Sequence, residues 1–239
     1  MTKHEFIAIF EKVSAEMEAE IAEKEANRGP VIGFYNRKGG VGSTTLAYHA
    51  CMLARERGLS LAVASTDPTA ELHRWLELEP RSPSYSLSHD VDLAIIDVHS
   101  HTEELSWDVD VWVVPIVDRR SFEHACAVSD QIVGGDIFWL PNIQPALRER
   151  AWSLEVPEHL REEVKLLPAI PRSVAIAKQV DQRQSVWASP STAETKAARV
   201  LRATLARILD EAMTWPDESE VIAARFARSA PADEPSDRI

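Results

Sequence analysis

The stretch Asn36 to Thr45, NRKGGVGSTT, has the residue types of a phosphate-binding loop. Its three glycines let the main chain turn tightly and aim successive N–H groups into a concave anion site. Thr44 stands where such a loop places a hydroxyl on Mg²⁺, but Ser43 replaces the lysine that normally follows the last glycine. The loop predicts a nucleotide site without its usual lysine; the alternative is a glycine-rich turn that binds nothing.

Two aspartates follow apolar runs farther along the chain, Asp67 after 59–64 and Asp97 at the end of 93–97. His99 and His101 come directly after Asp97, and His-x-His beside an aspartate can ligate zinc or a similar transition ion. No third histidine or cysteine at ligand spacing stands nearby in the sequence. The sequence therefore favours ordinary variation in a switch-like loop at His99 and His101 over a dedicated metal site.

Four motifs in the same order resemble the ParA/MinD family of deviant Walker A P-loop ATPases. KGGVGSTT at 38–45, preceded by Asn36, is similar to the family's KGGxGK[ST]T. Asp67-Pro68 resembles the end of D-x-D-P-Q, and Asp97 resembles the Walker B aspartate. IPRSVAIA at 170–177 is similar to IPRRVALAEA of ParA-type partition proteins, which the chain resembles most. The resemblance covers about residues 31–210.

The resemblance implies a nucleotide-sandwich homodimer that binds ATP or ADP with Mg²⁺. Lys38 matches the signature lysine that reaches the partner subunit's nucleotide phosphates. Thr44 matches the Mg²⁺ ligand, with Asp97 behind it through metal-bound water. Asp67 matches the aspartate that orients the attacking water, although it could also cap a helix starting near Ala70. The loop positions that would bind the nucleotide are Gly39, Gly40, Val41, Gly42, Ser43, Thr44 and Thr45.

Ser43 bears on turnover more than on binding. A cation about 4 Å from a phosphate oxygen contributes on the order of 4 kcal/mol at an effective dielectric constant near 20. Main-chain N–H groups and Mg²⁺ do not depend on the missing lysine, whereas phosphoryl transfer depends on charge stabilisation. We expect slow or absent ATP hydrolysis, with Arg37 and a neighbouring subunit's Lys38 as candidates to offset the loss.

The elements that must position these residues alternate as in a doubly wound, mostly parallel α/β sheet. Apolar runs predict strands at 31–35, 59–64, 92–97, 109–117, 137–140 and 165–170. Helices are predicted at 44–57, 121–133, 157–164 and 192–213. The predicted domain organisation is an N-terminal amphipathic helix at 1–29, a ParA-like nucleotide-binding domain at 30–213, and a short helix with a disordered tail at 214–239. The N-terminal helix either folds back on the domain or serves a partner or second subunit.

The net charge of −12 argues against a protein whose whole surface is positively charged for nucleic-acid binding. Residues 172–209 are an exception, with seven basic and two acidic side chains. A solvated helix face explains such a pattern, but the resemblance implies non-specific DNA binding through this region. The candidate DNA-binding residues are Lys196, Arg199, Arg202 and Arg207.

Nothing in the sequence predicts a secretory signal or an apolar run near the roughly 20 residues that cross a bilayer. We therefore expect a cytoplasmic protein without membrane association, at the nucleoid if it binds DNA. The resemblance implies DNA or plasmid partition, or positioning of another cargo, with a ParB-like adaptor. The alternative is a non-hydrolysing regulatory or scaffold descendant of the same fold.

Overall fold

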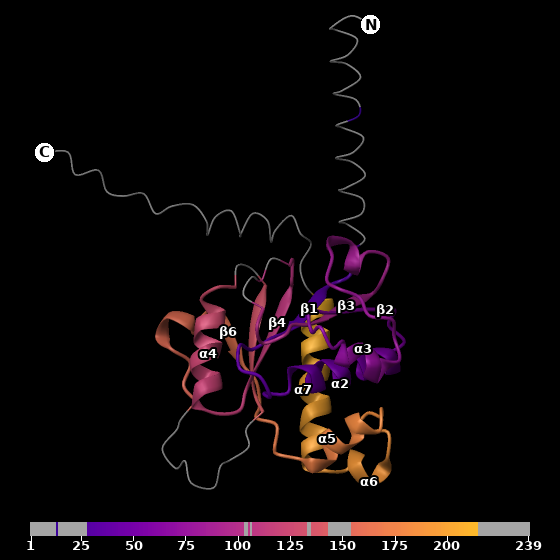
Figure 1. Ribbon diagram of the computed structural model, residues 1–239. Helices are drawn as coiled ribbons and strands as arrows, with labels where there is room; N and C mark the ends of the chain where they lie inside the picture. Colours follow the sequence, from indigo (N-terminus) through magenta and orange to yellow (C-terminus); the bar gives the residue numbers. More distant parts are fainter. Residues whose placement is uncertain are drawn as a thin grey trace, which may run out of the picture.

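The computed structural model describes residues 13, 28–102, 105, 107–132, 135–142 and 154–214 (Figure 1). Nearly all of the expected N-terminal helix and of the segment 214–239 lies outside these residues, so both stay predictions. None of the described helices is long and apolar enough to cross a membrane.

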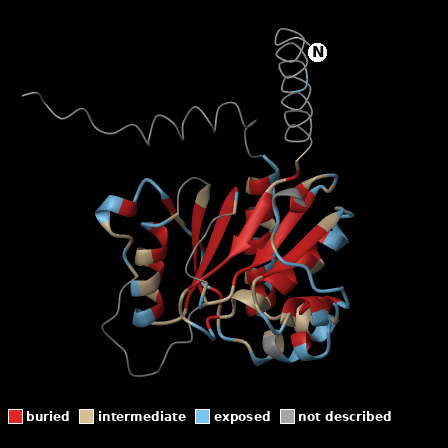
Figure 2. Ribbon diagram, turned by 45° about the horizontal axis from the view of Figure 1, so that its top comes forward, coloured by how far each residue is buried: buried red, intermediate tan, exposed pale blue. Residues whose placement is uncertain are grey.

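Six strands form one sheet in the order β2-β3-β1-β4-β5-β6, and every neighbouring pair is parallel. The strands are β1 Val31–Phe34, β2 Leu61–Ser65, β3 Leu93–Asp97, β4 Val111–Ile116, β5 Asp136–Pro141 and β6 Val164–Leu166. This confirms the predicted α/β fold, and the sheet of described strands is wholly parallel. The apolar runs are continuous because strands of such a sheet are buried on both faces (Figure 2).

Helices cover both faces of the sheet, with α4 on one side and α2, α3 and α7 on the other (Figure 1). The described helices are α2 Ser43–Glu56, α3 Glu71–Leu76, α4 Arg119–Ser129, α5 Val174–Asp181, α6 Pro190–Ala193 and α7 Lys196–Met213, with 3₁₀ turns η1 Tyr85–Ser88 and η2 Glu158–Leu160. Ile32 and Phe34 of β1 pack in the core beneath α2 and α7, whereas Val31 and Tyr35 belong to the core beneath α4.

Two predicted helices and one predicted strand differ from the structure. The strand expected at 165–170 is β6, which ends at Leu166. The helix expected at 157–164 is only the turn η2, because Val164 pairs with Ile137 as the first residue of β6. The helix expected at 192–213 is broken before Lys196. There Thr195 has extended backbone, and its hydroxyl caps α7 by accepting from the Ala198 N–H.

The carboxyl ends of β1, β2 and β3 lie level at one edge of the sheet. Asp97, the last residue of β3, is in register with Phe34 of β1 and with Ser65 of β2. Strands β2 and β3 lie on one side of β1, and β4 to β6 lie on the other. Where the loops that follow two adjacent parallel strands run in opposite directions, a crevice opens at the carboxyl ends of the strands, and α/β proteins bind ligands there.

Candidate functional site

The glycine-rich loop between β1 and α2 requires glycine at defined positions. Gly40 and Gly42 have φ angles of +75° and +96°, which L side chains rarely adopt. A Cβ atom on Gly42 would lie 2.9 Å from Asn142 Nδ2, and that amide donates to the Val41 carbonyl at 3.0 Å. Gly42 is also the N-cap of α2, so the positive end of the helix dipole faces the loop.

A cavity of about 460 Å³ opens in front of this loop and collects the predicted site residues. Its lining includes all of Lys38 to Thr45, together with Asp67 after β2 and Asp97 at the end of β3. The wall is completed by Asn36, Thr69, Glu71, Trp75 and the segment 98–100. Residues that stand some 30 positions apart in the sequence are thus brought to one place.

Asp97 is buried in the floor of the cavity. One of its carboxylate oxygens, Oδ2, has no hydrogen-bond partner among the described residues. Burial raises the pKa of this carboxyl to about 7, against a hydrogen bond from Thr44 that lowers it, and the charges of Asp67 and Glu71 raise it further. An unpartnered carboxylate oxygen beside a threonine hydroxyl is the oxygen donor set that Mg²⁺ prefers. Thr44 and Asp97 therefore fit a magnesium ion.

Asp67 organises the loop after β2. Its carboxylate accepts hydrogen bonds from the Thr69 N–H at 2.9 Å and from the Thr69 hydroxyl at 2.7 Å. Burial raises its pKa, but these bonds and one from the Glu71 N–H outweigh burial and hold the pKa below its usual value. The N-cap of α3 is Ala70, with φ +49°, rather than Asp67. Asp67 is thus an anionic group on the cavity wall.

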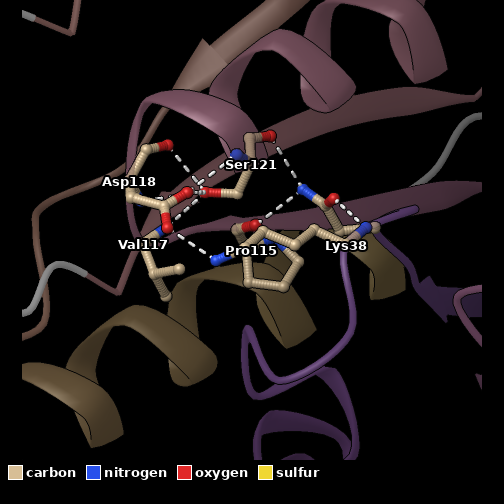
Figure 3. Close-up of polar contacts among 6 residues, drawn as sticks. Lys38, Pro115, Val117, Asp118 and Ser121 are labelled. Atoms are coloured by element: carbon tan, nitrogen blue, oxygen red, sulfur yellow. Dashed lines mark hydrogen bonds and ion pairs between the residues drawn. The ribbon is translucent and has the colours of Figure 1, made fainter.

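Lys38 is held by an ion pair within its own chain. Its Nζ lies 2.6 Å from Asp118 Oδ2, and both side chains are partly exposed (Figure 3). Asp118 is the N-cap of α4 and accepts from the Ser121 N–H at 2.9 Å in a capping box. Burial raises the pKa of Asp118, but the hydrogen bonds from Lys38 and Ser121 outweigh it and hold that pKa low. Lys38 therefore already has an anionic partner within its own chain.

The buried Asn36 fixes the start of the loop against the neighbouring strand. Its Nδ2 donates to the carbonyls of Pro115 and Ser121, at 2.9 and 3.1 Å, and its Oδ1 accepts from the Lys38 N–H at 2.8 Å. The sequence predicts neither this role of Asn36 nor the pairing of Lys38 with Asp118. A signal for Asp118 was present, because aspartate is among the residues preferred at the N-cap of a helix.

Arg37, the other candidate to offset Ser43, points elsewhere. Its guanidinium donates to Gln131 Oε1 at 2.7 Å, and it lines a neighbouring hollow with Ser100, His101 and Thr102. The charged side chains on the main cavity are the carboxylates of Asp67, Glu71 and Asp97, with Lys38 as the cation among the described lining residues.

The two histidines after β3 lie together at the edge of the site. The rings of His99 and His101 are 5.2 Å apart, and His99 lines the main cavity. No group of three His, Cys, Asp or Glu side chains in the described part of the chain is placed to hold a metal ion.

The basic residues of α7 have carboxylate neighbours. Arg202 pairs with Glu56 at 3.0 Å and lies over the Trp187 ring, 5.5 Å from its centroid. Arg199 lies 3.6 Å from Glu194, and Arg207 lies 3.8 Å from Glu211. Lys196 forms no ion pair with the described residues. Arg202 is therefore anchored, whereas Arg199 is two-thirds exposed and loosely paired.

Comparison with known proteins finds similarity in structure only. No protein-family model and no curated protein sequence matches the chain. Among solved structures, apo McdA from Cyanothece has a TM-score of 0.53 and 12% identity, covering 75% of this chain and 99% of that one. MinD with Mg-ADP from Pyrococcus horikoshii has a TM-score of 0.54 and 15% identity, and the match covers 75% of this chain and 96% of that one. A ParA family ATPase from Chlorobium tepidum has a TM-score of 0.50 and 13% identity, and the match covers 80% of this chain and 100% of that one. The chain therefore has the fold of the ParA/MinD-type P-loop ATPases.

Proposed function

We propose that this chain is a ParA/MinD-like protein that binds ATP or ADP with Mg²⁺ and hydrolyses ATP slowly. One observation carries the proposal: the glycine-rich loop, the Thr44 hydroxyl and the unpartnered carboxylate oxygen of Asp97 converge on one cavity. The MinD structure of the same fold is a complex with Mg-ADP, which supports this choice of ligand.

Each part of the cavity has a role in binding. Main-chain N–H groups of the loop and the amino end of α2 would face the nucleotide phosphates. Thr44 and Asp97 would hold Mg²⁺, which supplies positive charge to the phosphates when bound. Three carboxylates and one paired lysine make the described cavity wall poor in free positive charge. Nucleotide affinity should therefore depend strongly on the divalent cation.

Slow turnover follows from two features of the same wall. Ser43 offers no charge to the terminal phosphoryl group, and Lys38 is bound to Asp118. Stabilisation of charge that develops in the transition state is commonly the largest part of catalysis, and one lost donor costs about 10²- to 10³-fold in rate. Asp67 keeps its anionic carboxylate on the cavity wall, where it could orient a water molecule.

For the cellular role we propose DNA or plasmid partition, or positioning of another cargo. The protein would dimerise around nucleotide through Lys38 and act with a ParB-like adaptor. The motif resemblance and the shared fold with a ParA family ATPase support this proposal.

Non-specific DNA binding remains part of the proposal, centred on Lys196 and Arg199. A double Lys196→Ala, Arg199→Ala variant should weaken DNA retention, and wild-type retention should fall steeply with salt. Arg202→Ala is the matched control, because Arg202 is engaged with Glu56 and Trp187. Unchanged retention in the double variant would count against DNA binding by α7.

A non-hydrolysing regulatory or scaffold protein is the second candidate. The observation that favours it is the combination of Ser43 with the Lys38–Asp118 pair, which leaves the described cavity lining without an unpaired cation. Such a protein would respond to nucleotide binding alone.

Calorimetric titration with ATP and with ADP, each with Mg²⁺ and again with EDTA, tests these proposals beside a phosphate-release assay. Binding that needs Mg²⁺, with slow phosphate release, supports the first candidate. Binding without release supports the second. If the wild-type protein binds neither nucleotide, the proposed nucleotide function is refuted and a scaffold role remains.

A further inference from the structure

The segment that follows β3, residues 98–102, is fixed over the glycine-rich loop. A Cβ atom on Gly39 would lie 3.6 Å from Ser100 Oγ, so the two segments are in close contact. The His99 N–H donates to Thr66 Oγ1 at 2.7 Å, and that hydroxyl lies 3.0 Å from Thr102 Oγ1. At the other end of the segment, the Tyr35 hydroxyl donates to the Thr102 carbonyl at 2.7 Å. The backbone of His99 is therefore held at the cavity wall.

The ring of His99 presents a hydrogen-bond donor. Its Nδ1 atom accepts the main-chain N–H of His101 at 3.4 Å, which leaves the ring N–H on Nε2. No hydrogen bond joins Nε2 to any of the described residues. The His99 side chain lines the same cavity as the glycine-rich loop, Thr44 and Asp67.

The described lining of the cavity offers no unpaired cationic donor to a terminal phosphate. Ser43 stands where a lysine ammonium would be and carries no charge. The Lys38 ammonium is paired with Asp118, and the Arg37 guanidinium donates to Gln131. The loop N–H groups would take the inner phosphates, so the wall formed by Asp67, Thr69 and His99 is left for the terminal one.

We propose that His99 donates its Nε2–H to the terminal phosphate of a bound nucleoside triphosphate and serves there in place of the missing lysine. This inference rests on the nucleotide binding proposed above. Its consequence is discrimination between triphosphate and diphosphate, because only the triphosphate carries the acceptor.

The expected effect is specific to the triphosphate. Hydrogen bonds to charged groups are strong enough that His99→Ala should weaken binding of a non-hydrolysable ATP analogue about tenfold. The affinity for ADP should stay within about twofold, because ADP would not reach this donor. His99→Gln carries an amide N–H and should retain part of the preference. The control is His101→Ala, which keeps the main-chain N–H that bonds His99 Nδ1.

Calorimetry with the Mg²⁺ forms of the ATP analogue and of ADP, on the wild type and the three variants, tests the inference. Loss confined to the analogue in His99→Ala, with His101→Ala unaffected, supports it. Equal loss for both nucleotides, or none, overturns it while the nucleotide function stands. If the wild type binds neither nucleotide, the proposed function has failed and the inference falls with it. Thermal melting checks that each variant folds. If His99→Ala does not fold, the same comparison is made with His99→Gln: a partial loss confined to the ATP analogue supports the inference, and equal loss for both nucleotides, or none, overturns it.

Discussion

Replacing Asp97 by asparagine should change the stability of the nucleotide-free protein in a pH-dependent way. Asp97 is only 2% exposed, and burial raises its pKa to about 7. Between the unfolded value of 3.8 and about 7 the native chain holds a proton that the unfolded chain has released. The contribution of the protonated carboxyl is therefore fully present below pH 4 and is lost as the pH rises through 7.

The magnitude follows from the two pKa values. Their separation is about three pH units, and at 1.36 kcal/mol per unit the wild type loses at most ~4 kcal/mol between acid and pH 8.5. Asparagine has nearly the same shape and no charge, so this loss should be absent in Asp97→Asn. Its unpartnered amide costs about 1–3 kcal/mol at every pH. Relative to the wild type, the variant should gain ~3 kcal/mol of stability between pH 5 and pH 8.5, and it should be the more stable protein at pH 8.5.

Urea denaturation in EDTA at pH 5 and pH 8.5 measures this difference in the free energy of unfolding. Asp110→Asn is the matched control, because Asp110 is equally buried but accepts from Arg28 and from the Val31 N–H, each at 2.7 Å. Burial raises the pKa of Asp110 as well, but its carboxylate has an ion-pair partner in Arg28, so that variant should lose stability at both pH values. If Asp97→Asn is destabilised equally at both, Asp97 has no charge that awaits a cation, and the reasoning for the Mg²⁺ site is wrong.

The remaining predictions concern the loop and its lysine. Ser43→Lys should raise steady-state phosphate release at least about tenfold, and an unchanged rate would contradict the role given to the missing charge. Asp118→Asn keeps the α4 cap but frees Lys38, so nucleotide-dependent dimerisation measured by light scattering should increase; no increase would mean that the pair does not restrain Lys38. Gly42→Ala should lower the melting temperature more than Gly58→Ala, because both have positive φ but only Gly42 lacks room for a Cβ atom. Equal melting temperatures would refute that explanation.

The five strands β1 to β5 could be predicted within about two residues because each shows the buried, continuous apolar run of a parallel sheet, whereas β6, which is only partly buried, ends four residues before its predicted end. The sequence does not predict helix α5, and it predicts α3 only as the alternative in which Asp67 caps a helix near Ala70. Helices α3 and α5 have six and eight residues, which is too short to display a 3.6-residue period. In α3 the N-cap is Ala70, so no polar cap residue signals where the helix begins.

Site residues that stand within one motif could be predicted, whereas partners from distant segments could not. Local spacing brings Gly42 and Thr44 to the same turn, whatever the rest of the chain does. Lys38 and Asp118 are 80 positions apart and meet because β4 is the neighbour of β1, a strand order that the sequence does not state. Arg202 and Glu56, 146 positions apart, depend in the same way on how α7 crosses α2.

The pairing of Lys38 with Asp118 and the substitution at Ser43 act in the same direction. Each removes positive charge from a cavity whose described wall already carries three carboxylates. Phosphate charge must then be met by Mg²⁺, by main-chain N–H groups and by donors such as His99. Because acceleration of hydrolysis needs a further cation, it has to come from outside this set. A second chain could supply one directly, or could draw Lys38 away from Asp118. Turnover in this protein should therefore be governed by assembly more than by the loop itself.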